Sequence, residues 1–92
     1  MFLIGGKVVH PGDIIRLSRA DQVNIYRYCD FAFDAAPPQD FIYLSREDML
    51  LVLISDEHEL FMISSKGSST FKKGDKDLEM TGWEFVQTSS QE

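Results

Sequence analysis

The segment with the densest set of reactive side chains is Asp56-Glu57-His58-Glu59, which combines three carboxylates with one imidazole. A catalytic zinc site needs three protein ligands of these types and one open position. On a strand, Asp56 and His58 point to one side and the two glutamates to the other, so neither side supplies three ligands. We therefore interpret the segment as a solvated hairpin turn and expect no metal site.

A second acidic pattern, Asp75-x-Asp77-x-Glu79, follows Gly74 and superficially matches a calcium-binding loop. It has neither the glycine in the middle of such a loop nor the bidentate glutamate at its twelfth position. Three lysines in the same short stretch also oppose a divalent cation. The pattern is typical of an exposed charged turn, and we predict no cofactor.

Nucleophilic catalysis finds little support in the sequence. The single cysteine, Cys29, precedes Asp30, and a neighbouring carboxylate disfavours the thiolate that a reactive cysteine requires. Cys29 alternates in step with Ile25 and Phe31, which is typical of a small buried hydrophobic residue. No serine lies in a Gly-x-Ser-x-Gly motif, and two histidines are present to act as a base. We expect no catalytic residue and no enzymatic activity.

Aromatic residues form 12% of the chain, more than the core of so small a domain needs. Tyr26 and Tyr28 alternate with the apolar residues around them, which places both phenol rings on the opposite face of the strand. Exposed tyrosines beside carboxylates can hold a proline-rich segment or a cationic side chain. The alternative is that both faces are covered, one of them by the loop around Pro37-Pro38. The predicted partner-binding residues are Tyr26, Tyr28, Tyr43, Trp83, Asp30 and Asp34.

The net charge of -6 lies entirely in the second half of the chain. Residues 1–46 hold five basic and five acidic side chains, whereas residues 47–92 hold four lysines and ten carboxylates. Nucleic-acid binding needs cationic surface to neutralise phosphates, so this balance argues against direct nucleic-acid binding. The balance favours a basic protein partner instead.

A length of 92 residues allows one small domain, which we place at 1–87, followed by a flexible tail at 88–92. No apolar run reaches the roughly 20 residues that span a bilayer, and no signal peptide is visible. A lone cysteine forms no internal disulfide. The sequence therefore predicts a cytoplasmic protein that makes no membrane contact.

Short β-prone runs separated by turn residues would position these side chains. Gly5-Gly6 predicts a hairpin, Pro11-Gly12 predicts the next turn, and a further turn is expected at 65–69. Alternation places Ile15 and Leu17 on one face of their strand. Strands are predicted at 2–4, 7–10, 13–17, 41–44, 49–54, 60–63, 70–71 and 83–86.

Two segments are compatible with a helix as well as a strand. Residues 23–33 alternate with period two, which favours a long strand or a bent pair of strands over a helix capped by Ser18. Residues 49–54 are apolar throughout, which fits a strand buried on both faces at the centre of the core. A helix beginning at Ser45 is the alternative there. We predict strands in both segments.

These strands predict an all-β fold, a small antiparallel barrel of five or six strands that resembles SH3-like barrels in architecture. On this scaffold we expect a non-enzymatic interaction module that binds a basic or proline-rich protein through exposed aromatics. It would be an adaptor or inhibitor of the kind that viruses and mobile elements encode. The alternative is an acidic decoy that mimics nucleic acid and occupies a DNA- or RNA-binding cleft. A homodimer formed through an uncovered strand edge, such as 60–63, is a third hypothesis.

Overall fold

The computed structural model describes residues 1–19, 22–26, 28–30 and 41–89, and for 22–26, 28–30 and 41 it describes the backbone alone. In these ranges the chain is mainly β and contains no helix. The strands are β1 (Phe2–Ile4), β2 (Lys7–Val8), β3 (Ile14–Leu17), β4 (Gln22–Tyr26), β5 (Tyr28–Asp30), β6 (Phe41–Ser45), β7 (Leu50–Ser55), β8 (Glu59–Ser64), β9 (Gly67–Lys72), β10 (Leu78–Glu79) and β11 (Trp83–Gln87). The predicted β class is confirmed, and the helix alternative at 49–54 is wrong.

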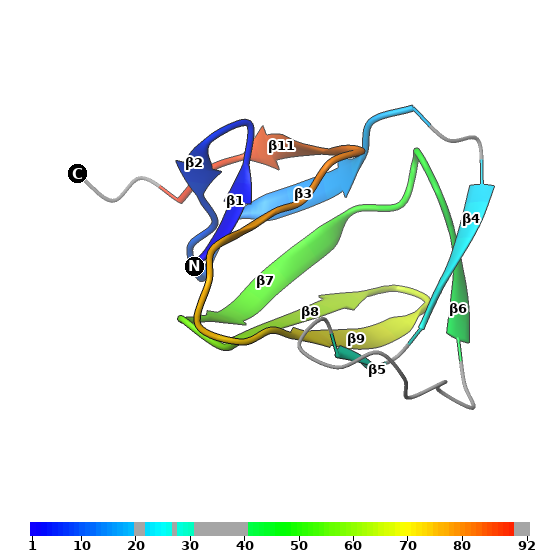
Figure 1. Ribbon diagram of the computed structural model, residues 1–92. Helices are drawn as coiled ribbons and strands as arrows, with labels where there is room; N and C mark the ends of the chain where they lie inside the picture. The colour runs from blue at the N-terminus through cyan, green and yellow to red at the C-terminus, as the bar shows by residue number, and fades with distance from the viewer. Residues whose placement is uncertain (20–21, 27, 31–40, 90–92) are drawn as a thin grey trace.

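Hydrogen bonding among the described strands forms a six-stranded sheet in the order β11-β3-β7-β8-β9-β5. β1 lies between β2 and β10 in a three-stranded sheet, and β4 pairs with β6 in a two-stranded ribbon. Figure 1 shows that the large sheet curls, so that β3 and β11 lie across from β8 and β9, with the β4–β6 ribbon at one end. No closed barrel is found among the strands of the described ranges.

Two strand pairs are parallel, so the expectation of a wholly antiparallel fold is wrong. β1 runs parallel to β10, with Phe2 opposite Leu78, and β5 runs parallel to β9, with Tyr28 opposite Thr70. Parallel neighbours cannot be joined by a tight turn and need a long connection. The turn residues of a sequence therefore indicate hairpins and give no signal for these two pairs.

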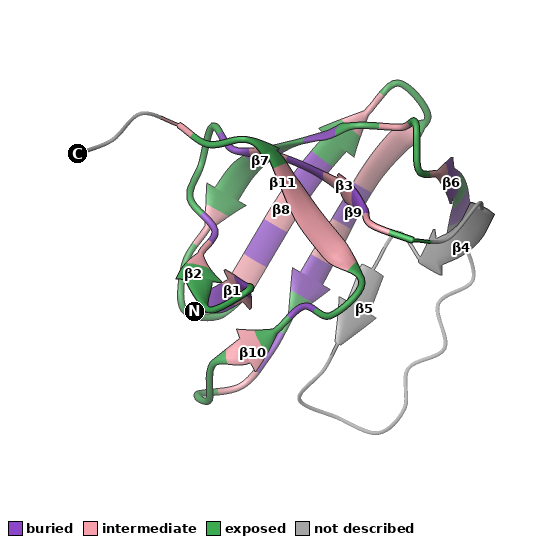
Figure 2. Cartoon of the chain, turned by 90° about the horizontal axis from the view of Figure 1, so that it is seen from above, coloured by how far each residue is buried: buried purple, intermediate pink, exposed green. Residues whose placement is uncertain are grey.

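The core is enclosed by the curl of the large sheet. Alternate side chains of β7 and β8 point into it, and Figure 2 shows buried bands that alternate with less buried bands along β8. Ile15 and Leu17 are both buried, and Trp83 and Phe85 both pack against the core, as the alternation of these strands predicts. The buried core residues are Phe2, Ile4, Val9, Ile15, Leu17, Ile42, Leu44, Leu50, Val52, Leu60, Met62, Phe71 and Met80.

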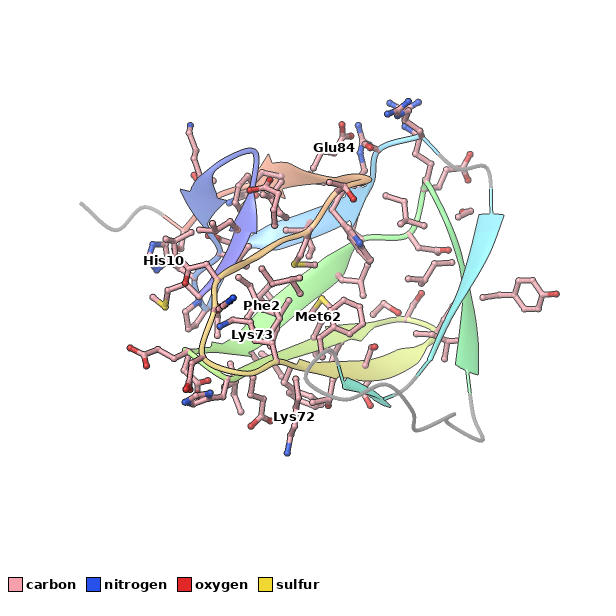
Figure 3. The ribbon with its side chains drawn as sticks, in the orientation of Figure 1. Phe2, His10, Met62, Lys72, Lys73 and Glu84 are labelled. Atoms are coloured by element: carbon pink, nitrogen blue, oxygen red, sulfur yellow. The ribbon has the colours of Figure 1, made fainter. Side chains whose placement is uncertain are left out.

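Two charged residues are buried with this core. The Asp13 carboxylate, 1% exposed, accepts the backbone N–H of His10 at 2.8 Å and that of Ser89 at 2.6 Å. The Lys73 ammonium donates to the backbone carbonyl of Glu57 at 2.5 Å and lies 5.5 Å from the centroid of the Phe2 ring. Figure 3 shows Lys73 directed inward beside Phe2, whereas its neighbour Lys72 points outward. Because buried charges are costly unless they are hydrogen-bonded, these contacts are what permits both residues in the core.

Candidate functional site

The tyrosines predicted to bind a partner lie on three strands. Tyr43 is on β6, opposite Asn24 of β4, and is 53% exposed. Tyr26 ends β4 and Tyr28 begins β5, and these strands pair with different neighbours, β6 and β9. The two strands agree with the predicted pair of strands as far as residue 30, and residues 31–33 of that prediction lie outside the described structure. The side chains of Tyr26 and Tyr28 lie outside the described part of the structure.

The other predicted contact residues are not gathered around Tyr43 in the described structure. Trp83 is half-buried against the core, and its ring meets that of Phe71 edge-on, with centroids 6.2 Å apart and planes at 74°. This T-shaped geometry is typical of stabilising aromatic pairs, so Trp83 has a packing role. Asp30 is opposite Lys72 in the β5–β9 register, and its side chain, like the whole of Asp34, lies outside the described residues.

Residues 56–58 form the turn between β7 and β8, one residue shorter than predicted because Glu59 already begins β8. One oxygen of the Asp56 carboxylate accepts the backbone N–H groups of His58 and Glu59, both at 2.8 Å. These hydrogen bonds, that of His58 first, hold the pKa of Asp56 below its usual value. The carboxylate therefore shapes the turn. Within the described ranges, no group of three or more His, Cys, Asp or Glu side chains is placed to hold a metal ion.

The second acidic pattern acts on the N-terminal hairpin. The Asp77 carboxylate lies 2.7 Å from the Met1 amino group, whose hydrogen bond lowers the pKa of Asp77. Glu79 accepts the N–H of Gly5 at 2.6 Å. Gly5 and Gly6 have φ of 59° and 81°, the positive values that a two-residue hairpin turn requires, so the predicted hairpin is confirmed. Asp77 thus ties the β10 region to the N-terminus, and Glu79 ties it to the β1–β2 turn.

A surface that the sequence did not reveal lies on the outer side of β7. The prediction that residues 49–54 are buried on both faces is wrong: Leu51, Leu53 and Ile54 are 36%, 43% and 44% exposed. Leu50 and Val52, which alternate with them, are fully buried. Burial on both faces needs a second covering layer, usually of helices, and the described chain has no helix. One face of the strand is therefore left to solvent.

A β-bulge widens this exposed surface. β7 pairs with β8 at Val52–Met62 and next at Ile54–Phe61, so Leu53 and Ile54 together lie opposite a single residue. The bulge interrupts strict alternation, and two consecutive large side chains are exposed.

Neighbouring strands extend the surface sideways. The strand register aligns Ile14 of β3 with Leu51 of β7 and Leu51 with Ile63 of β8. Residues directly opposite one another on adjacent strands share a face of the sheet. Ile63 is 37% exposed, and Met49, just before β7, is 49% exposed. We define the outer apolar face as Met49, Leu51, Leu53, Ile54 and Ile63.

β8 is not an edge strand. It lies between β7 and β9, so the hypothesis that 60–63 offers an uncovered edge for a dimer is wrong. β9 also begins earlier than predicted, because the turn expected at 65–69 consists of Ser65 and Lys66 alone. β8 is paired on both sides along its length, whereas β7 is paired on its other side with β3 at Leu50 and Leu51 and with the preceding turn at Val52.

Charged groups surround the outer apolar face. The turn with Asp56 and Glu57 follows β7 directly, and at the other end of β7 the Lys66 ammonium lies 2.8 Å from the Asp48 carboxylate. The hydrogen bond from Lys66, followed by that from the backbone of Ser45, holds the pKa of Asp48 below its usual value. These contacts leave the carboxylate of Asp48 ionised and fixed.

The flank of the face on β3 and β11 carries an ion pair of its own. The Arg16 guanidinium lies 2.5 Å from the carboxylate of Glu84, which Figure 3 labels on this side of the molecule. A shallow depression of about 470 Å³ beside Arg16 is also lined by Ser45, Arg46 and Glu47. The depression mixes cationic and anionic groups, and it therefore favours neither an anion nor a cation.

A comparison of the chain with protein-family models, curated proteins and solved structures finds no match. Among the described residues, no helix is long and apolar enough to cross a membrane. The function has to be inferred from the surface itself.

Proposed function

We propose that the protein is a non-enzymatic interaction module that binds a protein partner through the outer apolar face. The supporting observation is that five large apolar side chains, between 36% and 49% exposed, lie on and beside two paired strands. Single exposed apolar residues are common, whereas contiguous exposed apolar patches mark interaction sites. An adaptor or inhibitor fits this role, and the single cysteine is compatible with a cytoplasmic location.

Exposed aromatics remain part of the proposal as a second contact region. Tyr43 is more than half exposed on the β4–β6 ribbon, which stands at one end of the large sheet in Figure 1. An exposed tyrosine offers a large contact area at a small cost in side-chain entropy. Tyr26, Tyr28, Asp30 and Asp34 are proposed to contribute from the same part of the chain.

We also propose that the architecture is related to SH3-like barrels. In the large sheet, β3, β7, β8 and β9 lie side by side in the order in which they occur along the chain. The last strand of the chain, β11, pairs with β3, the first strand of this sheet. A small barrel closes when its last strand pairs with its first. This strand order supports the relationship.

A second candidate function is an acidic decoy that occupies a nucleic-acid-binding cleft. The charge distribution favours it, since residues 47–92 carry ten carboxylates and four lysines. A decoy binds through its carboxylates, so its binding falls steeply as salt is added. Apolar contacts persist at high salt, and the two candidates therefore differ in a measurable property.

A pull-down with the immobilised protein at low and high salt tests these proposals. The test variant carries Leu51→Thr and Ile63→Thr, which keep β-branched or β-compatible residues on the strands. The matched control is Val86→Thr, which replaces an exposed apolar side chain on β11, outside both proposed contact regions. Retention of the same protein by the wild type and the control at both salts, and its loss from the double variant, supports the outer apolar face. Equal retention by the double variant contradicts it, and loss of all binding at high salt supports the decoy.

A further inference from the structure

We propose that the outer apolar face binds an amphipathic segment of the partner whose apolar side chains are flanked by lysine or arginine. This inference rests on the proposed function. Three features of the β7–β8 hairpin favour this type of partner segment. They are the pairing of its backbone, the type of its exposed side chains and the charge around them.

The pairing of the backbone excludes binding by strand addition at this face. β7 pairs with β3 and β8, and β8 pairs with β7 and β9. A peptide that adds to a sheet needs a run of unpaired backbone groups at an edge, whereas β8 is paired on both sides and β7 is bonded on its second side from Leu50 to Val52. The partner must therefore present side chains, as an amphipathic helix does when it lies on an apolar surface.

The exposed side chains favour such a segment over a proline-rich one. The exposed side chains of the outer apolar face are those of one methionine, two leucines and two isoleucines. Phe61, opposite Ile54 in the strand register, adds a single half-buried aromatic ring, which does not form a groove. Proline-rich segments dock into grooves lined by aromatic rings. Flexible or branched aliphatic side chains instead adapt to the apolar stripe of a helix.

The charged groups around the outer apolar face favour a partner segment that carries basic residues beside its apolar side chains. The Lys66 ammonium is paired with Asp48 and the Arg16 guanidinium with Glu84, while the Lys73 ammonium is buried and bound to carbonyls. These cations are already engaged within the chain, whereas Glu57 is exposed in the turn that follows β7 and forms no ion pair among the described residues. Cationic groups of a partner would thus meet net negative charge at this end of the face.

A second copy of the chain is the less suitable occupant. Each copy carries a net charge of -6, concentrated in the half that contains the face. Two copies that met face to face would bring these like charges together, which opposes association. A basic segment gains from the same charge.

The inference is tested with three fluorescein-labelled helical peptides that share one leucine stripe and carry lysine, glutamine or glutamate at all other positions. Fluorescence anisotropy measures their affinity for the wild type, for the Leu51→Thr/Ile63→Thr variant and for the Val86→Thr control. We expect the lysine peptide to bind the wild type and the control at least about tenfold more tightly than the double variant. Glu57→Lys, which leaves the apolar side chains intact, should weaken the lysine peptide and not the glutamine peptide.

The possible failures are distinguishable. Equal affinity for the lysine and glutamine peptides would overturn the requirement for basic flanks and leave the face itself as a protein-binding site. Binding of the lysine peptide that is the same in the double variant would overturn the assignment of the segment to this face. Sedimentation that shows a dimer of the wild type and a monomer of the double variant would overturn the inference in favour of a second copy. In each case the pull-down tests the proposed function independently.

Discussion

The inner and outer faces of the β7–β8 hairpin are built from the same kinds of residue but differ in burial. Leu50 is fully buried, and Leu51, its neighbour in sequence, is 36% exposed. Met62 and Ile63 on β8 differ in the same way. The inner side chains lie in a core that the curl of the sheet encloses, while nothing in the described chain covers the outer ones. Residue type thus determines which side chains are suited to burial, and the covering layer determines which are buried.

The largest expected difference between the two faces is in stability. Leu50→Ala should lower the free energy of unfolding by about 2–5 kcal/mol, because it removes buried contacts and leaves a cavity. Leu51→Ala should lower it by less than about 1 kcal/mol, because solvent already surrounds much of that side chain. Urea denaturation of both variants measures the difference. Equal losses would mean that the outer face is covered in solution.

A polar version of the same comparison uses Lys72 and Lys73, which point to opposite sides (Figure 3). Lys73→Met should cost about 1–3 kcal/mol, because it leaves the carbonyls of Glu57 and Gly74 without the ammonium that binds them. Lys72→Met should cost less than about 1 kcal/mol, since polar contacts of an exposed side chain contribute little. The same denaturation experiment checks both values, and a larger loss for Lys72 would contradict the assignment of the two sides.

A smaller effect is expected at the border of the outer face, where Asp48 holds Lys66 and the Ser45 backbone. Its pKa is lowered from 3.8 on folding, so its ionised form stabilises the fold at pH values above about 4. This contribution is lost as the pH falls through the lowered folded-state pKa. Asp48→Asn should therefore reduce stability at pH 6 by about 1 kcal/mol or less and by a smaller amount at pH 3. Asp75→Asn, at an exposed turn, serves as the control, and parallel pH profiles for Asp48→Asn and the wild type would contradict the role of the ion pair.

The smallest effect on stability is expected for the outer face itself. Leu51→Thr/Ile63→Thr should change the free energy of unfolding by about 0.5 kcal/mol or less, because the removed groups are already partly hydrated and threonine suits a strand. The same variant should bind much less of an apolar fluorescent dye such as ANS. Unchanged dye fluorescence in a folded variant would show that these side chains do not form the exposed patch.

Much of the fold could be predicted because hairpins have local signals. Period-two alternation placed Ile15 and Leu17 on the inner face, and Gly5-Gly6 marked a turn that needs two positive φ values. The bulge at Leu53 and Ile54 could not be predicted, because it depends on the register of β7 against β8. The parallel pairs could not be predicted either, since they join segments far apart in the chain.

The candidate site was harder to predict than the fold. Tyr43 was expected to be exposed and is exposed. The apolar run 49–54 was assigned to the core because hydrophobicity alone does not reveal how many layers cover a strand. The sequence nevertheless carries a signal: it predicts an all-β fold, and such a fold has no helix to cover a second face of the strand. A long apolar run in an all-β chain of this size is thus a reason to look for an interaction surface.

The most direct test of the outer apolar face is methyl NMR of the protein with labelled leucine and isoleucine methyl groups, titrated with the leucine–lysine peptide. The methyl signals of Leu51, Leu53, Ile54 and Ile63 should shift in proportion to occupancy, while those of Leu50 and Leu60 on the inner face should move little. Shifts confined to methyl groups outside the β7–β8 hairpin, or no shift at saturating peptide, would contradict a binding site on this face.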